Sequence, residues 1–202
     1  SANSCATPQR LERKLPLVVS RVAVSRVAVA VATMACERGA AAAMRLAQQY
    51  ARVAARAGEV PIGAAVVDAE GTLLAAGRNR TRERGDASAH AEVEALRAAA
   101  RRLGDWRLAD CHLVSSLEPC CACLACAQAF RVQSVTYGAP EPRFGCVASS
   151  RAAAGAELCN NHPNYRKHRP IKLSGGLMAE ESAKLVQDFF LQKRTSAAND
   201  DE

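Results

Sequence analysis

Short apolar runs alternate with longer stretches of helix-forming residues along most of this 202-residue chain. The apolar runs are bounded by glycine, proline, asparagine or aspartate, which is typical of strands. The longer stretches are rich in Ala, Glu, Arg and Leu, which favour helices. This order predicts an α/β domain of three layers, with helices on both faces of a mixed central sheet. We expect helices at 40–57, 89–103, 119–130 and 179–193, and strands at 61–67, 72–77, 111–116, 132–137 and 171–173.

Two details of these helices are predicted as well. Ser88 is a plausible N-cap for the second helix, because its hydroxyl can accept a backbone N–H of the first turn. The last helix is amphipathic and carries Leu185, Phe189 and Phe190 on its apolar side.

The compact domain is expected to cover residues 39–195, with an acidic tail at 196–202. Residues 1–38 are expected to form a flexible tail. Its first part is basic and nearly free of acid, which is the composition of an organellar transit segment; a disordered tail is the alternative. The apolar run at 17–31 contains Arg21 and Arg26, so it predicts no membrane span.

Charge and cysteine content both constrain the function. Lys and Arg number 27 against 20 Asp and Glu, and a net charge of +7 favours polyanionic partners, nucleic acid first. Nine cysteines are an odd number, and four of them crowd between Cys120 and Cys126. Such crowding indicates metal binding or catalysis in a reducing compartment, not a disulfide scaffold. We therefore expect an intracellular protein, cytoplasmic or nuclear, with a plastid or mitochondrion as the alternative.

The cysteines Cys120 and Cys123 follow Pro119 at the start of a predicted helix. A spacing of three places them on one helix face, and the helix N-terminus favours thiolates, which are zinc ligands. Cys121 is rotated away by roughly 100°, and Cys126 lies deeper in the helix. We expect these two cysteines to be packing residues.

The segment His90-Ala91-Glu92 supplies the other reactive groups, also at a helix start. With His90 as the third ligand, one Zn²⁺ per chain would keep a coordination position for water, as catalytic zinc sites do. Glu92 lies beside the ligand but points in its own direction. Its carboxylate is the expected proton shuttle of a hydrolytic reaction.

The pattern H-x-E…P-C-x-x-C is the signature of zinc-dependent deaminases. From about residue 40 to 194 the chain resembles the tRNA-specific adenosine deaminases of the cytidine deaminase-like superfamily, a family that includes the catalytic subunit of the eukaryotic wobble adenosine deaminase. The matching segments are Glu59-Val-Pro-Ile-Gly-Ala64, Gly77-Arg-Asn79, Ala89-His-Ala-Glu92, Trp106-Arg-Leu-Ala-Asp110, Leu117-Glu-Pro-Cys120 and Asp188-Phe-Phe190.

This resemblance implies a cytidine deaminase-like α/β/α fold and the conversion of adenosine to inosine at the wobble position of a tRNA anticodon. It implies that Asn79, Ala91 and Glu118 contact the substrate. A base inside a duplex cannot reach the metal, so the target must be unpaired or flipped out. The residues expected near the anticodon stem-loop are Arg166, Lys167, Arg169, Phe189, Phe190, Lys193 and Arg194, of which the basic ones could contact phosphates.

Other functions stay open at this point. Guanine deaminases that act on a free base and cytidine deaminases share the zinc motifs, and a structural zinc-binding subunit is an alternative without activity. The predicted C-terminal helix and the basic stretch favour RNA over a free base.

The subunit arrangement is also open. The segment Glu141-Pro-Arg-Phe-Gly145 looks eukaryotic, whereas Asn161-His-Pro163 looks bacterial or plastid-like. We therefore expect a homodimer or a heterodimer with a related deaminase subunit. Ser115-Ser116 replaces the usual valine-threonine before Leu117.

Overall fold

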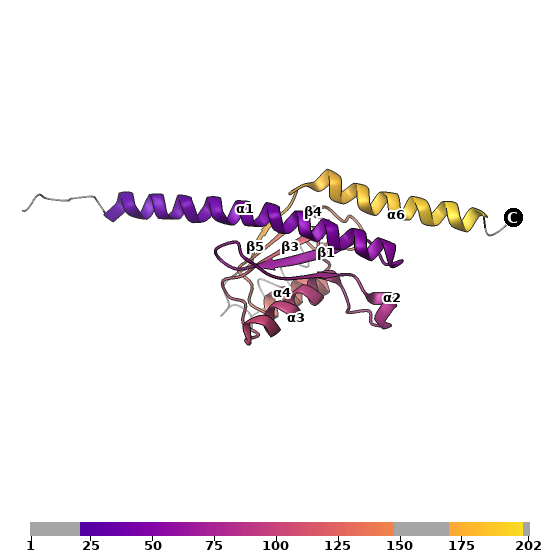
Figure 1. Ribbon diagram of the computed structural model, residues 1–202, viewed down its shortest axis with the longest axis horizontal. Helices are drawn as coiled ribbons and strands as arrows, with labels where there is room; N and C mark the ends of the chain where they lie inside the picture. The colour runs from indigo at the N-terminus through magenta and orange to yellow at the C-terminus, as the bar shows by residue number, and fades with distance from the viewer. Residues whose placement is uncertain (1–20, 148–169, 200–202) are drawn as a thin grey trace, which may run out of the picture.

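The computed structural model describes residues 21–147 and 170–199, and its centre is a five-stranded sheet (Figure 1). The strand order is β2-β1-β3-β4-β5. β1 is antiparallel to both of its neighbours, whereas β3, β4 and β5 run parallel. The sheet is therefore mixed, as predicted. The strands are β1 (Gly63–Val67), β2 (Leu73–Arg78), β3 (His112–Leu117), β4 (Ser134–Ala139) and β5 (Lys172–Ser174).

Helices cover both faces of this sheet. In Figure 1, α1 (Arg21–Arg56) and α6 (Ala179–Asn199) lie on one side of the strands, and α3 (Ala91–Leu103) and α4 (Cys121–Ala129) lie on the other. The short α2 (Thr81–Arg84) lies beyond the end of β2. This arrangement confirms the predicted three-layer α/β/α fold. None of the helices described is both long and apolar enough to cross a membrane.

Strand β1 shows how the two outer layers are built. All five of its residues are buried, because side chains alternate between the two faces of a strand and both faces are covered. Ala64 and Val66 join the core beneath α3 and α4. Ala65 and Val67 join a second core against α1. A continuous apolar strand is what a sheet covered on both faces requires.

Helix α3 approaches β2 closely at Gly77. A Cβ at position 77 would lie 2.6 Å from the carbonyl oxygen of Ala91 and 2.7 Å from the backbone nitrogen of Ala95. Any side chain here would push the helix away from the sheet. The glycine therefore fixes the height at which α3 presents its first turn, which carries Glu92 and follows His90.

The N-terminal half of the chain is more helical than we predicted. The helix expected from residue 40 begins at Arg21, within the segment that we expected to be a tail. No proline interrupts residues 21–56, and the many alanines favour continuation. A further short helix, α2, lies between the predicted strand 72–77 and the predicted helix 89–103.

Ser88 is not the N-cap of α3. The helix begins at Ala91, and His90 takes the N-cap position. The backbone N–H and the hydroxyl of Ser88 both donate to Oδ1 of Asp86, at 2.7 and 2.8 Å. Asp86 is a local acceptor that holds Ser88 in a turn, because an aspartate readily binds the backbone two residues on. The helix consequently starts later than predicted.

Candidate active site

Three potential metal ligands meet where two helices begin. His90 is the N-cap residue of α3, Cys120 is the N-cap residue of α4, and Cys123 lies in the first turn of α4. Their ligand atoms all lie within 4.8 Å of one another. The Nδ1 atom of His90 is 3.3 Å from Sγ of Cys123 and 3.7 Å from Sγ of Cys120. Among the residues described, no other trio of histidine, cysteine or acidic side chains converges in this way.

The thiols of this cluster share their protons unequally. The S–H of Cys123 and the ring of His90 form hydrogen bonds to Cys120, which lower the pKa of Cys120 to about 4. The pKa of Cys123 is raised, because its proton is held by Cys120 and the thiol is buried. The hydrogen bond to Cys120 raises the pKa of His90. One imidazole, one thiolate and one thiol are a donor set that fits zinc, which displaces the remaining thiol proton when it binds.

The carboxylate of Glu92 lies against the cluster and is only 3% exposed. Its Oε1 atom accepts a hydrogen bond of 3.0 Å from the hydroxyl of Ser115, and its Oε2 atom accepts one of 3.4 Å from Sγ of Cys123. Burial is the main cause that raises the pKa of Glu92, and the negative charge of Cys120 adds to it. Oε2 is therefore the oxygen that faces the ligands, and the group retains its proton to higher pH than an exposed glutamate does.

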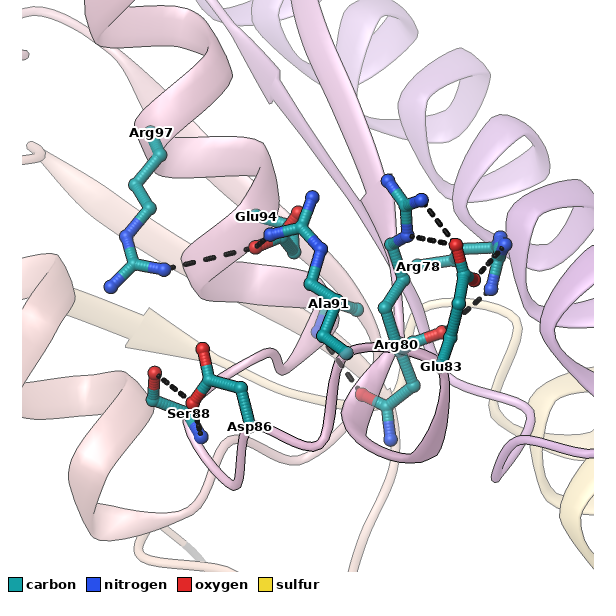
Figure 2. Close-up of polar contacts among 10 residues, drawn as sticks. Arg78, Arg80, Glu83, Asp86, Ser88, Ala91, Glu94 and Arg97 are labelled. Carbon is teal, nitrogen blue, oxygen red and sulfur yellow. Dashed lines mark hydrogen bonds and ion pairs between the residues drawn. The ribbon is translucent and has the colours of Figure 1, made fainter.

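Asn79 is buried and connects the end of β2 to the start of α3. Its Oδ1 accepts a 3.1 Å hydrogen bond from the backbone N–H of Ala91, drawn in Figure 2 as the dashed line that starts at Ala91. Its own backbone N–H donates to the carbonyl of Ile62. Because Oδ1 binds a donor, the side-chain NH₂ group must point the other way. Asn79 thus orients the residue between His90 and Glu92.

The rim beside Asn79 is a network of ion pairs (Figure 2). Arg78 and Arg80 both bind the carboxylate of Glu83, and their hydrogen bonds lower the pKa of Glu83 to about 2. Arg84 lies 2.8 Å from Oε1 of Glu94 on α3, and Arg97 approaches the same carboxylate. The four arginines thus share two acids, and the pair of Arg84 with Glu94 ties α2 to α3.

Glu59 anchors α2 through hydrogen bonds to its backbone. It was not identified as a functional residue from the sequence. Its buried carboxylate accepts the backbone N–H groups of Arg82 and Glu83, at 2.8 and 2.9 Å. The only sequence signal for it was its place in the motif that begins at residue 59. A contact across 23 residues of chain leaves no local pattern.

Glu118, which the resemblance suggested as a substrate contact, is buried beneath the segment 141–147. Its Oε2 accepts the backbone N–H of Glu141 at 2.9 Å, and its Oε1 accepts that of Val147 at 2.7 Å. The carboxylate therefore fastens this segment beside Cys120, which forms a bridge with Gly145. Contact of Glu118 with the substrate stays a prediction.

The remaining predicted residues are spread over the molecule. Phe189 and Phe190 on α6 meet edge to face at 5.4 Å, and Nζ of Lys193 lies 5.9 Å from the Phe189 ring. Lys193 and Arg194 are exposed. Phe190 is 43% exposed, although we expected it on the buried side, because the last turns of α6 extend past the sheet (Figure 1). Arg166, Lys167 and Arg169 lie outside the described residues.

Of the two cysteines expected to pack, only one does. Cys126 is partly buried and contacts the core beneath α4. Cys121 is exposed, so its prediction as a packing residue was wrong. Cys121 is the first residue of the helix, where the turn of roughly 100° that removes it from the metal face also directs it to solvent.

Residues 37–139 match the family described as the cytidine and deoxycytidylate deaminase zinc-binding region. The match covers half of the chain and includes all three clustered ligands and Glu92. The chain therefore belongs to this family of zinc-binding deaminases. Its cofactor is zinc.

Relatives place the chain within that family. It is 38% identical to the tRNA-specific adenosine deaminase of Agrobacterium fabrum over 75% of this chain and 93% of the relative. A solved structure from a study of A-to-I editing by tRNA:A34 deaminases has 38% identity and a TM-score of 0.63, over 71% of this chain and 97% of that one. The chain is accordingly grouped with the tRNA-specific adenosine deaminases.

Two other comparisons are more limited. The guanine deaminase of Nitrosomonas europaea has 26% identity and a TM-score of 0.60, over 74% of this chain and 83% of that one. The tRNA(Ile)-lysidine synthases of two Deinococcus species are 39% identical to this chain, which spans about a quarter of their length (26% and 27%).

Proposed function

We propose that this chain catalyses the hydrolytic deamination of adenosine to inosine at the wobble position of tRNA anticodons. The observation that carries the proposal is the buried Glu92, whose Oε2 lies 3.4 Å from Sγ of Cys123 in the ligand cluster. A carboxylate beside three ligands, and not among them, suits proton transfer next to a catalytic metal. The 38% identity to a tRNA-specific adenosine deaminase over nearly its full length supports the choice of substrate.

In this proposal His90, Cys120 and Cys123 hold the zinc ion. When bound, zinc supplies Lewis acidity, which makes water nucleophilic near neutral pH. Overall, water and adenosine give inosine and ammonia. A C–O bond forms at C6 of the purine, and the bond from C6 to the exocyclic nitrogen breaks.

Glu92 moves the protons of this reaction through Oε2, the oxygen that faces the ligands. It takes a proton from the attacking water and delivers it to the ring nitrogen. It then takes the proton of the hydroxyl group added at C6 and delivers it to the amino group, which leaves as ammonia. Burial is the main cause that raises the pKa of Glu92, which makes its carboxylate a stronger base toward the water proton than an exposed glutamate. Ser115 holds Oε1, so the carboxylate keeps one orientation throughout.

Asn79 is the proposed polar contact to the nucleoside. Its Oδ1 is bound to Ala91, so the side chain offers the donors of its NH₂ group to an acceptor on the substrate. Ala91 and Glu118 are proposed to border the same site, Ala91 between the ligand His90 and the shuttle Glu92.

The proposed partner is a tRNA anticodon stem-loop, in which the target base is unpaired. Exposed Lys193 and Arg194 on α6, with Phe189 and Phe190 beside them, support a contact with the stem. Arg166, Lys167 and Arg169 are proposed to bind phosphates, on the basis of their charge and spacing.

We also propose a dimer, formed with an identical chain or a related deaminase subunit, as the catalytic unit. The exposed side chains of α4 are small, among them Cys121, Ala122 and Ala125, which permits close contact with another helix. Light scattering that gives the mass of a fully active monomer would rule this out. A thiol-rich site and a tRNA substrate support a reducing compartment inside the cell.

One experiment separates the proposed function from its alternatives. The purified chain is incubated with an anticodon stem-loop that carries a wobble adenosine and, separately, with free adenine, guanine and cytidine. We expect inosine in the stem-loop, detected by mass spectrometry, and little turnover of the free compounds. Glu92→Ala should keep its zinc and lose at least about 10²-fold in single-turnover rate. Faster deamination of guanine than of the stem-loop would assign the chain to the free-base enzymes.

A further inference from the structure

The side chain of Phe144 is 66% exposed, more than any other large apolar side chain that the structure describes. A phenyl ring in water is costly, since burying it would gain roughly 1.5–3 kcal/mol. A scattered apolar residue on a surface needs no explanation by itself. The location of Phe144 and the rigidity of its segment are what distinguish it.

The buried Glu118 side chain holds the segment 141–147 at both ends. Glu118 accepts the backbone N–H groups of Glu141 and Val147, and the N–H of Cys146 donates to the carbonyl of Pro119. Gly145 lies so close to Glu118 that a Cβ would meet its carboxylate at 2.4–2.6 Å. Phe144 is therefore displayed from a fixed backbone, which lowers the entropy that ordering it on a partner would cost.

This backbone is attached to the metal site. Gly145 pairs with Cys120, so Phe144 is one residue away from the partner of a zinc ligand. Arg143, on the other side of Phe144, is also exposed. An exposed aromatic ring and an exposed cation consequently lie within two residues of the backbone that pairs with the metal ligand Cys120.

We propose that Phe144 is a stacking platform for an unpaired base next to the deaminated adenosine, with Arg143 directed to the adjoining phosphate. The inference rests on the proposed function and names a further contact to the same RNA. When a base leaves the stack for the metal site, its neighbours lose a stacking partner. Exposed aromatic side chains take up such bases regardless of sequence, and arginine binds the backbone between them.

The test measures binding of an anticodon stem-loop by Phe144→Ala, Phe144→Leu and Phe144→Tyr. Loss of the ring should raise Kd about 5- to 100-fold, the range of base–aromatic stacking, whereas Phe144→Tyr should stay close to wild type. The salt dependence should not change in Phe144→Ala, but Arg143→Ala should lower the slope of log Kd against log salt by about 0.7. Leu103→Ala is the matched control, because Leu103 is exposed at the far end of α3 from His90.

A second RNA locates the contact. Each stem-loop is abasic at one position beside the target adenosine. When the missing base is the one that stacks on the ring, wild type and Phe144→Ala should bind that RNA with equal Kd. If Phe144→Ala raised Kd by the same factor for the intact RNA and for every abasic RNA, the proposal would be overturned. Unchanged binding of the intact RNA by Phe144→Ala would also overturn it. So would a change in molecular mass in light scattering, which would assign Phe144 to a protein contact. If the wild type fails to deaminate any stem-loop, the proposed function itself is wrong.

Discussion

The hydroxyl of Ser115 donates a 3.0 Å hydrogen bond to Oε1 of Glu92, and both side chains are buried. Ser115 lies on β3, between Ala64 of β1 and Tyr137 of β4, so strand pairing on both sides fixes its position. Valine is the usual residue here in the resembling family, and it has no donor. This chain therefore anchors its candidate proton shuttle to the sheet through a side chain that valine cannot replace.

Ser115→Val should slow catalysis without removing the metal. A buried acceptor that loses a donor costs about 1–3 kcal/mol, so kcat should fall about 5- to 100-fold while KM and zinc content stay near wild type. Ser115→Thr keeps the hydroxyl and should restore most of kcat. The control is Ser116→Ala, because the Ser116 hydroxyl binds Gly63 and not Glu92. That variant should lose stability but keep kcat, and equal losses of kcat in both variants would exclude a specific role for Ser115.

Zinc content should distinguish the four cysteines of α4 and its cap. Cys120→Ala and Cys123→Ala remove ligands that lie within 4.8 Å of His90, so the purified variants should contain little zinc. Cys121→Ala and Cys126→Ala should each retain one zinc per chain. Elemental analysis decides, and full occupancy in Cys123→Ala contradicts the assigned ligand set.

The rate at which each cysteine is alkylated should depend on the burial and the pKa of its thiol. Cys121 is exposed, whereas Cys111 is buried and its pKa is raised to about 11, chiefly by burial. Only the thiolate reacts, so at pH 8 iodoacetamide should modify Cys121 in minutes and Cys111 only after unfolding. Reactivity at Cys111 should rise as the pH approaches 11. Peptide mass mapping reports each site, and early modification of Cys111 at pH 8 is the result that disagrees. A chelator should add Cys120 to the reactive set.

Removal of Lys193 and Arg194 should weaken RNA binding by electrostatics alone. If each contacts a phosphate, the double alanine variant should lower the slope of log Kd against log salt by about 1.4, which is 0.7 for each contact on a single strand. The value of kcat at saturating RNA should change little, because neither residue belongs to the metal site. Lys184→Ala is a control on the same helix, where Lys184 pairs with Asp188. An unchanged slope in the double variant removes the proposed contact.

Local patterns predicted most of the architecture. Short apolar runs bounded by turn residues located all five strands to within a few residues, and their alternation with helix-forming stretches predicted a sheet covered on both faces. The spacing of Cys120 and Cys123 and the pair His90 and Glu92 predicted a cluster that the structure assembles from two helix starts. Those signals lie within three or four residues of each other in the chain.

The features that the sequence did not predict depend on contacts between residues far apart in the chain, or on residue types that occur in more than one environment. Glu118 binds backbone groups 23 and 29 residues away, and no pattern around it reveals those partners. Free cysteine is usually buried as a small apolar residue, so the exposure of Cys121 was missed. Ser88 has the right chemistry for a cap, but its hydroxyl and backbone N–H both donate to Asp86, which holds it in a turn before the helix.

The hydrogen bond from Ala91 to Asn79 also has an evolutionary consequence. One side chain, the proposed contact to the nucleoside, also fixes the start of the helix that carries the proposed proton shuttle and follows a metal ligand. A mutation at position 79 that altered base preference would disturb metal geometry in the same step. New substrate specificities in this scaffold should therefore arise first at exposed positions nearby, such as Arg143 and Phe144, whose side chains are not part of the contacts that hold Cys120.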